Sequence, residues 1–466
     1  MKEALEDDSG AFFMEIFKKT GLLKEPNRYS IIERRNIYLV KISLALEMRK
    51  TYICIDLKSF YASVECVARG LDPFSSNLVV ADPGRGHGAL CLAVSPAMKA
   101  RGVRNRCRLF EIPPEMKYIA ALLRMRQYME VSSDIYENYL KIFRREDIYA
   151  YSIDECFIDV TSYLPLYRMN GRRMALFLMK SIFVKTGISS SAGIGSNMFL
   201  AKVAMDVLAK HNAERAAVLD EDSFKEEIWH HRPITDIWGI GTHMATRLAK
   251  YGIFDLYGIT KVNESLLYKE FGKRAECLID HAYGREPCTI SDIHSYTPAA
   301  RSLSNGQVLF KDYDYESARL LTGEMAEVLI QQLLEKNLVA EGISLHVGYS
   351  GNERRGNGGS KKLETPTDIP KDIWAAFDRL YVEKVREEIP IRTVSLCLEN
   401  VRKAEEVPRI MSLFRSSEEE DRDKELERVM IQVKREFGKN ALLRGFNYAP
   451  GAMQQTRNGL VGGHHE

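Results

Sequence analysis

The stretch that decides the fold is Tyr52-Ile-Cys-Ile-Asp56-Leu-Lys-Ser-Phe60-Tyr61, in which a carboxylate stands inside a run of residues that predicts a buried strand. A second stretch, Tyr151-Ser-Ile-Asp154-Glu155-Cys-Phe-Ile-Asp159, repeats this pattern. Burying a carboxylate is costly unless it is paired or bound to a cation. Asp56, Asp154 and Glu155 are enough to hold two Mg²⁺ ions about 3.5–4 Å apart, as in displacement at phosphorus. Taken singly, each acid is explained as well by capping a strand or pairing with an arginine.

The bulk composition indicates a soluble protein of several domains. The chain has 466 residues, of which 45% are hydrophobic and 28% charged, and its formal net charge is +2. A nucleic-acid partner would therefore have to meet local basic patches. The 8 cysteines form no C-x-x-C pair, which indicates reduced thiols rather than a zinc site. The early acids and the absence of a long apolar run exclude a signal peptide and a membrane anchor, so we expect a cytoplasmic protein.

The order of elements from Tyr52 predicts a ferredoxin-like sheet. Strand, helix, a hairpin, strand–turn–strand around Asp154-Glu155, helix and strand follow one another up to Gly193. On a regular strand Asp154 and Glu155 would point to opposite faces, so a turn or bulge is expected there. The turn from Asp82 to Gly88 resembles a phosphate cradle, but it lacks the Gly-Lys-Ser/Thr ending and is better explained as a hairpin loop.

The rest of the chain is predicted to hold helices and a second α+β domain. We expect a helix over Asn197–Leu208 and further helices from Ile234 to about Tyr283. A loose stretch over Cys288–Ala300 then leads to strands and helices of a second α+β domain. An amphipathic helix is predicted over Glu418–Phe437, with its apolar face formed by Leu426, Val429, Val433 and Phe437. The residues before Tyr52 are explained either by an extra helical pair or by an upstream start ahead of Met48.

Three motifs resemble those of the Y-family, or translesion, DNA polymerases, and among them the bacterial UmuC-like ultraviolet-damage repair proteins. They are Cys-Ile-Asp56-Leu-Lys-Ser-Phe60-Tyr61-Ala-Ser-Val-Glu65, Ser152-Ile-Asp154-Glu155-Cys-Phe-Ile-Asp159 and Gly193-Ile-Gly-Ser-Asn197-Met-Phe-Leu-Ala-Lys202. They stand in the family's order, and the resemblance runs from Tyr52 to the C-terminal end. It implies a multidomain α+β right-hand polymerase with a ferredoxin-like palm, small fingers, a helical thumb and a separate α+β little finger.

This resemblance, together with the change in the pattern of expected strands and helices along the chain, sets the expected domain boundaries. They are an N-terminal extension of unknown role over 1–51, the palm over 52–60 and 125–209, the fingers over 61–124, the thumb over 210–287, a linker over 288–299, the little finger over 300–402 and a C-terminal tail over 403–466.

The resemblance also implies the roles of residues in the palm. Asp56, Asp154 and Glu155 would be the catalytic acids that hold two Mg²⁺ ions, with the backbone carbonyl of Leu57 as a further ligand. Asp159 is better explained as a structural residue that caps its strand.

The deoxynucleoside triphosphate would be bound by residues of the palm and the fingers. Tyr61 would stack under the sugar and exclude a ribose 2′-hydroxyl, with Phe60 lining the same pocket. Lys202 would reach the triphosphate, although a solvated lysine paired with Asp206 is the ordinary explanation. The fingers depart from the family, because Pro96 and Lys99 stand where many members have Tyr and Arg. Lys99 keeps the basic character, and Ser95 or a backbone N–H would replace the missing hydroxyl.

Primer–template DNA would be held by backbone contacts. Gly239 and Gly241, in Ile237-Trp238-Gly239-Ile240-Gly241, resemble a helix–hairpin–helix that presents N–H groups to phosphate. A basic hairpin of the little finger would lie on the DNA, although solubility alone also explains it; its residues are Arg354, Arg355, Lys361 and Lys362.

A short C-terminal peptide resembles the one by which bacterial polymerases dock on the sliding clamp. In Ile410-Met-Ser412-Leu413-Phe414, the residues Leu413 and Phe414 would anchor it, but Ile410 replaces the usual Gln. An apolar staple before the next helix explains this segment equally well.

The sequence thus predicts a template-dependent DNA polymerase of low fidelity that bypasses damaged bases. One rival is a nucleotide cyclase, which also needs paired metal-binding acids but neither a thumb nor a basic second domain. The other is a non-catalytic DNA- or clamp-binding relative of a polymerase, against which the retention of three costly buried acids counts.

Overall fold

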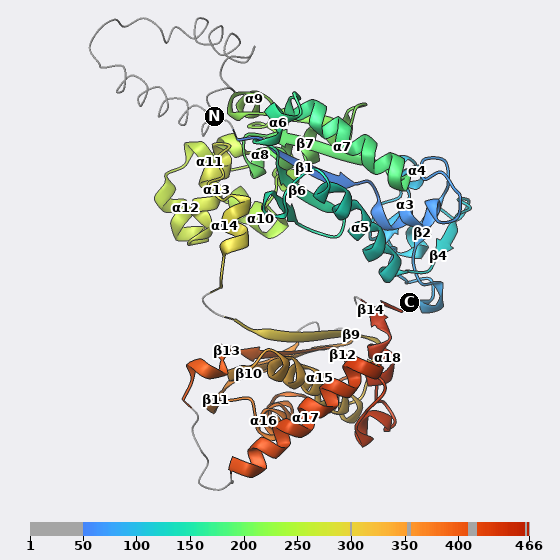
Figure 1. Ribbon diagram of the computed structural model, residues 1–466, viewed down its shortest axis with the longest axis vertical. Coiled ribbons are helices and arrows are strands. Elements are labelled where there is room, and N and C mark those ends of the chain that lie inside the picture. The colour runs from blue at the N-terminus through green and yellow to red at the C-terminus, as the bar shows by residue number, and fades with distance from the viewer. Residues whose placement is uncertain (1–49, 299–300, 352–355, 409–416, 462–463, 466) are drawn as a thin grey trace, which may run out of the picture.

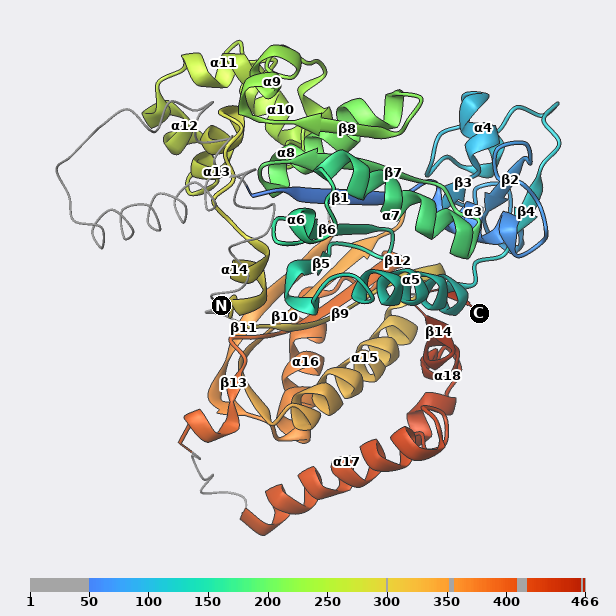
Figure 2. The same ribbon diagram turned by 45° about the horizontal axis from the view of Figure 1, so that its top comes forward.

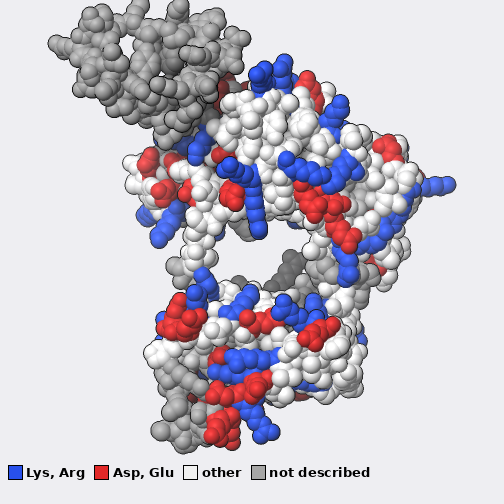
Figure 3. Space-filling view, in the orientation of Figure 1, with Lys and Arg blue, Asp and Glu red and all other residues white. Residues whose placement is uncertain are grey.

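The computed structural model describes residues 50–298, 301–351, 356–408, 417–461 and 464–465. The described chain forms an upper part with β1 to β8 and a lower part with β9 to β13, joined by the segment that follows α14 (Figure 1). The lower part turns its sheet toward the upper part and carries α15, α16 and α17 on the far side of that sheet (Figure 2). In the space-filling view an open gap separates the two parts (Figure 3). The predicted multidomain α+β architecture is confirmed.

The palm is a five-stranded sheet in the order β5-β6-β1-β7-β8. The strands are β1 (Tyr52–Leu57), β5 (Ile148–Ala150), β6 (Glu155–Asp159), β7 (Ser190–Gly195) and β8 (Ala216–Leu219), and the helices are α5 (Met125–Leu140), α6 (Tyr163–Leu166) and α7 (Gly171–Thr186). The strands β5, β6, β1 and β7 have the predicted ferredoxin-like order. Because β8 pairs in parallel with β7, the palm sheet extends to Leu219, beyond the boundary predicted at residue 209.

The two faces of β1 carry different neighbours, because successive side chains of a strand point to opposite faces. Ile53 and Ile55 pack in the core that contains Leu178 and Ile182 of α7. Cys54 packs on the other face against the helix that begins at Met198. Asp56 shares the alternation of Cys54, and the sheet therefore directs it toward that second helix.

This second helix is seated directly on the backbone of β7. It runs as α8 (Met198–Val203), then as a π-helical turn η5 (Ala204–Leu208) and a short 3-10 turn η6 (Ala209–His211). A Cβ at Gly193 would lie 2.0 Å from the Ala201 carbonyl oxygen, so only glycine allows this approach. The single regular helix predicted over Asn197–Leu208 is therefore wrong in its second half, where the π-turn inserts an extra residue.

The fingers contain a small sheet in the order β3-β2-β4. Its elements are α3 (Phe60–Val67), β2 (Leu78–Val80), β3 (Ala93–Val94), α4 (Pro96–Ala100) and β4 (Ile119–Ala121). The predicted pairing of the first two strands is confirmed, whereas the parallel strand β4 was missed. Glu65 fixes α3 to α5, because its buried carboxylate accepts hydrogen bonds from Arg124 Nη2 at 2.6 Å and Tyr128 Oη at 2.7 Å.

The thumb is helical and shares one apolar core with α8. Its helices are α9 (Glu221–Glu227), α10 (Thr242–Ala249), α11 (Leu256–Lys261), α12 (Glu264–Phe271) and α13 (Arg274–Ala282). The loose linker predicted over 288–299 is wrong in part, because it contains α14 (Ile290–Ser295). A Thr289–Asp292 capping box begins this helix, and His294 holds it against the palm through the Ile148 carbonyl oxygen at 3.0 Å.

The little finger is a sheet in the order β11-β10-β12-β9, covered by two helices. The elements are β9 (Leu303–Tyr313), α15 (Tyr315–Glu335), β10 (Leu338–Tyr349), β11 (Asn357–Thr367), α16 (Pro370–Lys384), β12 (Ile391–Glu399) and β13 (Arg402–Lys403). The part of the predicted basic hairpin that the structure describes is the edge strand β11.

A C-terminal extension packs on the helical side of the little finger. It consists of α17 (Ser417–Phe437), α18 (Gln454–Asn458), β14 (Leu460–Val461) and β15 (His464–His465), the last two forming a two-stranded sheet. The predicted helix is present, but three residues of its predicted apolar face, Leu426, Val429 and Phe437, are exposed.

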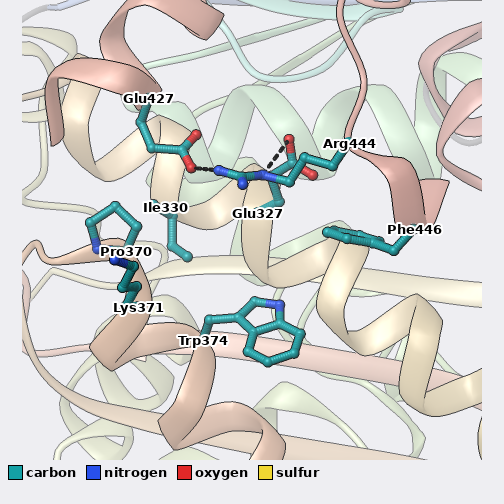
Figure 4. A pocket seen from close by; sticks show the side chains of 8 residues that line it. All are labelled: Glu327, Ile330, Pro370, Lys371, Trp374, Glu427, Arg444 and Phe446. Atoms are coloured by element: carbon teal, nitrogen blue, oxygen red, sulfur yellow. Dashed lines mark hydrogen bonds and ion pairs between the residues drawn. The ribbon is translucent and has the colours of Figure 1, made fainter. Parts of the chain in front are cut away.

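The helix docks through Ile431, which packs on the little-finger core, and through Lys434 Nζ, which lies 3.0 Å from Glu327 Oε1. On the same helix Met430 is buried, and Glu427 is buried against Arg444 (Figure 4).

No helix within the described ranges combines the length and apolarity required to cross a membrane. All eight cysteines are free thiols in the structure.

The seam between the thumb and the palm depends on His281. Its ring stacks on Phe199 of α8 with centroids 3.9 Å apart, and its Nε2 lies 2.9 Å from Glu286 Oε2. Burial lowers the pKa of His281, but hydrogen bonds to Cys277 and Glu286 outweigh burial and raise this pKa to about 9. Because the folded-state pKa is raised, this contribution to stability is fully present below about pH 6.5 and is lost as the pH rises through about 9.

We therefore expect the parent protein to lose thermal stability between pH 6.5 and 9, and His281→Gln to flatten this loss. Thermal unfolding followed by circular dichroism over this range measures the slope. The matched control is His243→Gln, because His243 is an exposed residue of α10. A slope in His281→Gln as steep as in the parent would contradict the assignment.

Candidate active site

A cavity of about 900 Å³ opens where the palm meets the fingers. The palm contributes Asp56 and Leu57 from the end of β1 and Asp154 from the turn before β6. Phe60 and Tyr61, at the start of α3, and Lys99 of α4 form another part of the wall. The structure thus brings together six of the residues predicted for chemistry and nucleotide binding.

The sheet register places the acids side by side. Asp56 lies opposite Glu155 in the antiparallel pair β1–β6, so the two side chains share a face. Asp154 is in the turn, where Leu57 N–H donates to its carbonyl oxygen at 2.9 Å. The expected turn at Asp154-Glu155 is therefore present, and it frees Asp154 from the alternation that would have sent it to the opposite face.

Two lysines of the second helix balance the buried acids. Lys210 Nζ lies 3.0 Å from Asp56 Oδ2, and Lys202 Nζ lies 2.6 Å from Glu155 Oε1. Asp206 joins the two lysines, at 3.0 Å from Lys202 and 2.8 Å from Lys210. The i,i+4 pairing of Lys202 with Asp206 considered from the sequence is present.

Burial and charge shift the pKa values of these groups in defined directions. Burial raises the pKa of Asp56, although the Lys210 ammonium opposes it, and burial likewise raises the pKa of Glu155 against the effect of Lys202. Burial alone would lower the pKa of Lys210, but the carboxylates of Asp56 and Asp206 outweigh it and raise this pKa. Both acids therefore depend on a nearby cation to stay ionised.

Lys210, and not Lys202 as expected from the sequence, is the lysine of this helix that lines the cavity. Lys202 is buried and is not among the residues that line the cavity, whereas Lys210 lines it. The extra residue of the π-turn carries the helix on so that Lys210 reaches the end of β1. The repeat Lys202, Asp206, Lys210 was the signal in the sequence, since it spaces three charges four residues apart.

The cavity wall is richer in cations than in acids. Four cationic side chains, Lys58, Lys99, Arg106 and Lys210, face two carboxylates, Asp56 and Asp154. Of these four residues, the sequence motifs predict only Lys99 as a contact of the triphosphate. Burial lowers the pKa of Lys99 and of Lys58, and in both cases a neighbouring cation adds to this effect. Crowded cations with lowered pKa values indicate a site for a polyanion.

Tyr61 presents an aromatic side to the cavity. Its ring stacks on Tyr128 with centroids 4.5 Å apart and an interplanar angle of 15°, and burial raises the pKa of its hydroxyl. Ser95, by contrast, is fully buried and does not line the cavity. Its hydroxyl accepts from Met98 N–H at the start of α4 and donates to the Ser76 carbonyl oxygen at 2.8 Å, so the expectation that it contacts phosphate is wrong.

The oxygen atoms of the acids are suitable ligands for a hard divalent cation, but the side chains are not arranged as a complete metal site. Carboxylate oxygens are the ligands that Mg²⁺ prefers, and each buried acid already holds a cation. Within the described ranges, however, no three His, Cys, Asp or Glu side chains converge on a point where one metal ion would be held. Lys210 and Lys202 already pair with Asp56 and Glu155, so a bound metal ion would compete with these ammonium groups.

The predicted DNA contacts are placed in part. Gly239 has a φ of 87° and Gly241 precedes the first turn of α10, both exposed, and Trp238 anchors their loop to the palm by donating from Nε1 to Tyr151 Oη at 3.1 Å. Lys361 and Lys362 are exposed on β11. The remaining predicted residues lie outside the described ranges; they are Arg354, Arg355, Leu413 and Phe414.

Comparisons with known proteins agree on one family. The model of the impB/mucB/samB family matches residues 55–206, and that of its C-terminal domain matches residues 300–412. The putative UV-damage repair protein UvrX of Bacillus subtilis is 32% identical, over 89% of this chain and 98% of the relative. DNA polymerase IV 2 of the same organism is 26% identical, over 90% of this chain and 99% of the relative. A Y-family DNA polymerase chimera of Dbh and Dpo4 shares the fold, with a TM-score of 0.60 and 21% identity over 76% of this chain and 99% of that chain.

We expect Lys210→Ala to bind Mn²⁺ about thirtyfold more tightly than the parent, since removing a unit charge about 4 Å from a divalent ion is worth roughly 2 kcal/mol even at the dielectric of water. Titration of the free protein, followed by the paramagnetic resonance of unbound Mn²⁺, measures this affinity. Lys225→Ala is the matched control, because Lys225 pairs with Asp222 on α9 and does not line the cavity. Equal or weaker binding by Lys210→Ala would show that the ammonium does not compete for Asp56.

Proposed function

The chain belongs to the impB/mucB/samB family and is a Y-family DNA polymerase that bypasses damaged templates, and we propose that it adds deoxynucleotides in the cavity between β1, α3 and α4. The observation that carries the proposal is the composition of the cavity wall, which combines two acids with four cations. The cations would bind the triphosphate, and the acids would bind the metal ions that nucleotide addition requires.

We propose Asp56, Asp154 and Glu155 as the residues that would hold two Mg²⁺ ions, with the Leu57 carbonyl as a further ligand. When bound, such ions neutralise the triphosphate and lower the pKa of the primer hydroxyl. Glu155 reaches the site from the buried face, where Cys54 and Lys202 hold its carboxylate. Lys202 thus acts as a positioning residue for Glu155 in this proposal.

The cations of the wall would bind the triphosphate. Lys210 and Lys99 are point charges on flexible stems, and Arg106 offers a planar guanidinium suited to phosphate oxygens. Lys210 has a second task, because it is also the counter-charge of Asp56 until nucleotide and metal arrive. Tyr61, held flat by Tyr128, would exclude a ribose 2′-hydroxyl, and Phe60 would line the sugar side.

We propose that the primer–template duplex occupies the gap between the palm and the little finger (Figure 3). The little-finger sheet turns toward this gap, and it carries a hollow of about 300 Å³ lined by Ser304, Ser344, His346 and Ser395 among others. Gly239 and Gly241 would offer backbone N–H groups, and Lys361 and Lys362 would add charge. A sliding clamp bound through Leu413 and Phe414 remains part of the proposal, as does a cytoplasmic location.

We expect Asp154→Ala to lower the rate of nucleotide addition by about a thousandfold or more, because several kcal/mol of charge stabilisation are lost. Primer extension on damaged and undamaged templates measures the rate, and fluorescence anisotropy checks that DNA binding is kept. Asp159→Ala is the matched control, since Asp159 accepts from Thr161 N–H at 3.0 Å and does not line the cavity. Near-normal extension by Asp154→Ala would leave a non-catalytic relative as the better explanation.

Tyr61→Ala should reduce discrimination against ribonucleotides by roughly 10–100-fold, because the ring that blocks the extra oxygen is gone. Single-nucleotide insertion with matched ribo- and deoxyribonucleotides gives this ratio. Tyr61→Phe keeps the ring and should keep the discrimination. If Tyr61→Ala still rejects ribonucleotides as the parent does, Tyr61 serves only to pack against Tyr128.

A further inference from the structure

The loop that precedes α10 carries a side chain that reaches from the thumb to the palm. In this loop Ile237 and Ile240 are buried in the thumb core, and Ile240 N–H donates to the Ile237 carbonyl oxygen at 3.1 Å. These contacts fix the loop to the thumb, whereas the ring of Trp238 lies against Tyr151 and Phe157 of the palm. A displacement of the loop is therefore transmitted to the palm through Trp238.

Trp238 meets the palm through packing and through one directional bond. Its ring centroid lies 6.0 Å from that of Phe157, which is fully buried in β6, the strand that carries Glu155. Its indole N–H donates to Tyr151 Oη at 3.1 Å, and these two rings meet edge to face at 83°. The rings supply contact area, while the hydrogen bond selects one orientation of Trp238 relative to Tyr151.

Tyr151 begins the turn that carries the catalytic acids. Tyr151 N–H and Ser152 N–H both donate to the Glu155 carbonyl oxygen, at 3.0 and 3.1 Å. Ser152 Oγ donates to Asp154 Oδ1 at 2.7 Å, and both residues line the active-site cavity. The turn is therefore one hydrogen-bonded unit, and a displacement of Tyr151 displaces Asp154.

The ring of Tyr151 also lies beside the partner of Glu155. Lys202 Nζ is 5.8 Å from the centroid of this ring and 2.6 Å from Glu155 Oε1. A cation at this distance is attracted to an aromatic face. Tyr151 thus contacts the surroundings of both acids, Asp154 through the turn and Glu155 through Lys202.

We propose that Tyr151 is a positioning residue that couples primer–template binding on the thumb loop to the placement of Asp154 and Glu155. The proposal rests on the proposed function, in which Gly239 and Gly241 meet the DNA backbone and the two acids serve nucleotide addition. Gly239 directly follows Trp238, so DNA bound to this loop holds the indole, and the indole holds Tyr151 and its turn. The acids are then fixed most firmly when DNA is present.

The hydroxyl of Tyr151 can be removed without removing the packing. Tyr151 is 42% exposed, so water can replace the lost hydrogen bond and the fold should be kept. Tyr151→Phe retains the ring that packs on Phe157, with centroids 5.8 Å apart, and that faces Lys202. This substitution therefore tests the link and not the aromatic cluster.

Hydrogen–deuterium exchange of the full-length protein, followed by mass spectrometry, tests the coupling without relying on polymerase activity. We expect primer–template DNA to slow exchange in the parent in the loop 237–241 and in the turn 151–155. Two amides of the turn report on its opening because they donate to the Glu155 carbonyl oxygen. In Tyr151→Phe the slowing in the loop should remain, and the slowing in the turn should fall by about half or more.

Single-turnover primer extension supplies the second readout. Tyr151→Phe should lower the rate constant of nucleotide addition about fivefold and leave the apparent Kd values for nucleotide and primer–template unchanged, because the link belongs to neither binding site. Trp238→Phe should act alike, and the double variant should lose no more than either single variant. Tyr149→Phe is the matched control and should resemble the parent, since Tyr149 belongs to the same aromatic cluster but does not accept the indole N–H.

Three results would overturn the proposal. They are exchange in the turn that DNA does not slow in the parent, equal slowing in Tyr151→Phe, and losses of rate that add in the double variant. If Trp238→Phe fails to fold, exchange in Tyr151→Phe decides alone. A parent that shows the coupled exchange but adds no nucleotide would refute the proposed function and leave the link standing, whereas a parent that extends primers without coupled exchange would do the reverse.

Discussion

Two carboxylates on neighbouring strands, Glu155 buried and Asp56 half-buried, need positive charge, and one helix supplies it. Asp56 and Glu155 share a face of the palm sheet, and Lys210 and Lys202 come to them from the helix that starts at Met198. The helix can lie close enough only because Gly193 has no side chain where it crosses β7. A single methyl group at that position would push the lysines away and leave the acids uncompensated in the sheet.

The sequence predicted the ferredoxin-like palm because each strand and helix was marked by its own periodicity. It also predicted the turn at Asp154-Glu155, since adjacent acids on a regular strand would have faced opposite ways. It failed where long-range packing decides the outcome. The π-turn over Ala204–Leu208 leaves no mark in a pattern of apolar residues, so Lys202 was placed on the nucleotide and Lys210 was missed.

The exposed apolar side of α17 has a comparable cause. Periodicity predicts that Leu426 and Val429 belong to the apolar face of this helix, but the helix turns its other side inward. There Met430 is buried, Lys434 pairs with Glu327 of α15, and Glu427 pairs with Arg444 of the C-terminal extension. From the sequence alone, an acid such as Glu427 is predicted to be a surface residue. Its partner Arg444 lies too far along the chain to be identified from the local pattern of residues. Fold class was therefore predictable from the sequence, whereas the choice between two faces of one helix was not.

The walls of the active-site cavity explain why this fold tolerates damaged templates. The fingers line the cavity with four small or apolar residues, Leu92, Ala93, Pro96 and Ala100, beside the polar Lys99, Asn105 and Arg106. Apolar contact discriminates between shapes by only about 1–3 kcal/mol, while strict selection needs buried polar groups that a wrong partner would leave unpaired. The positive charge of the wall comes from Lys58, Lys99, Arg106 and Lys210, which we propose as the groups that hold the triphosphate. In the proposed function, such a site would hold the triphosphate, which every nucleotide shares, more firmly than the base, which a lesion alters.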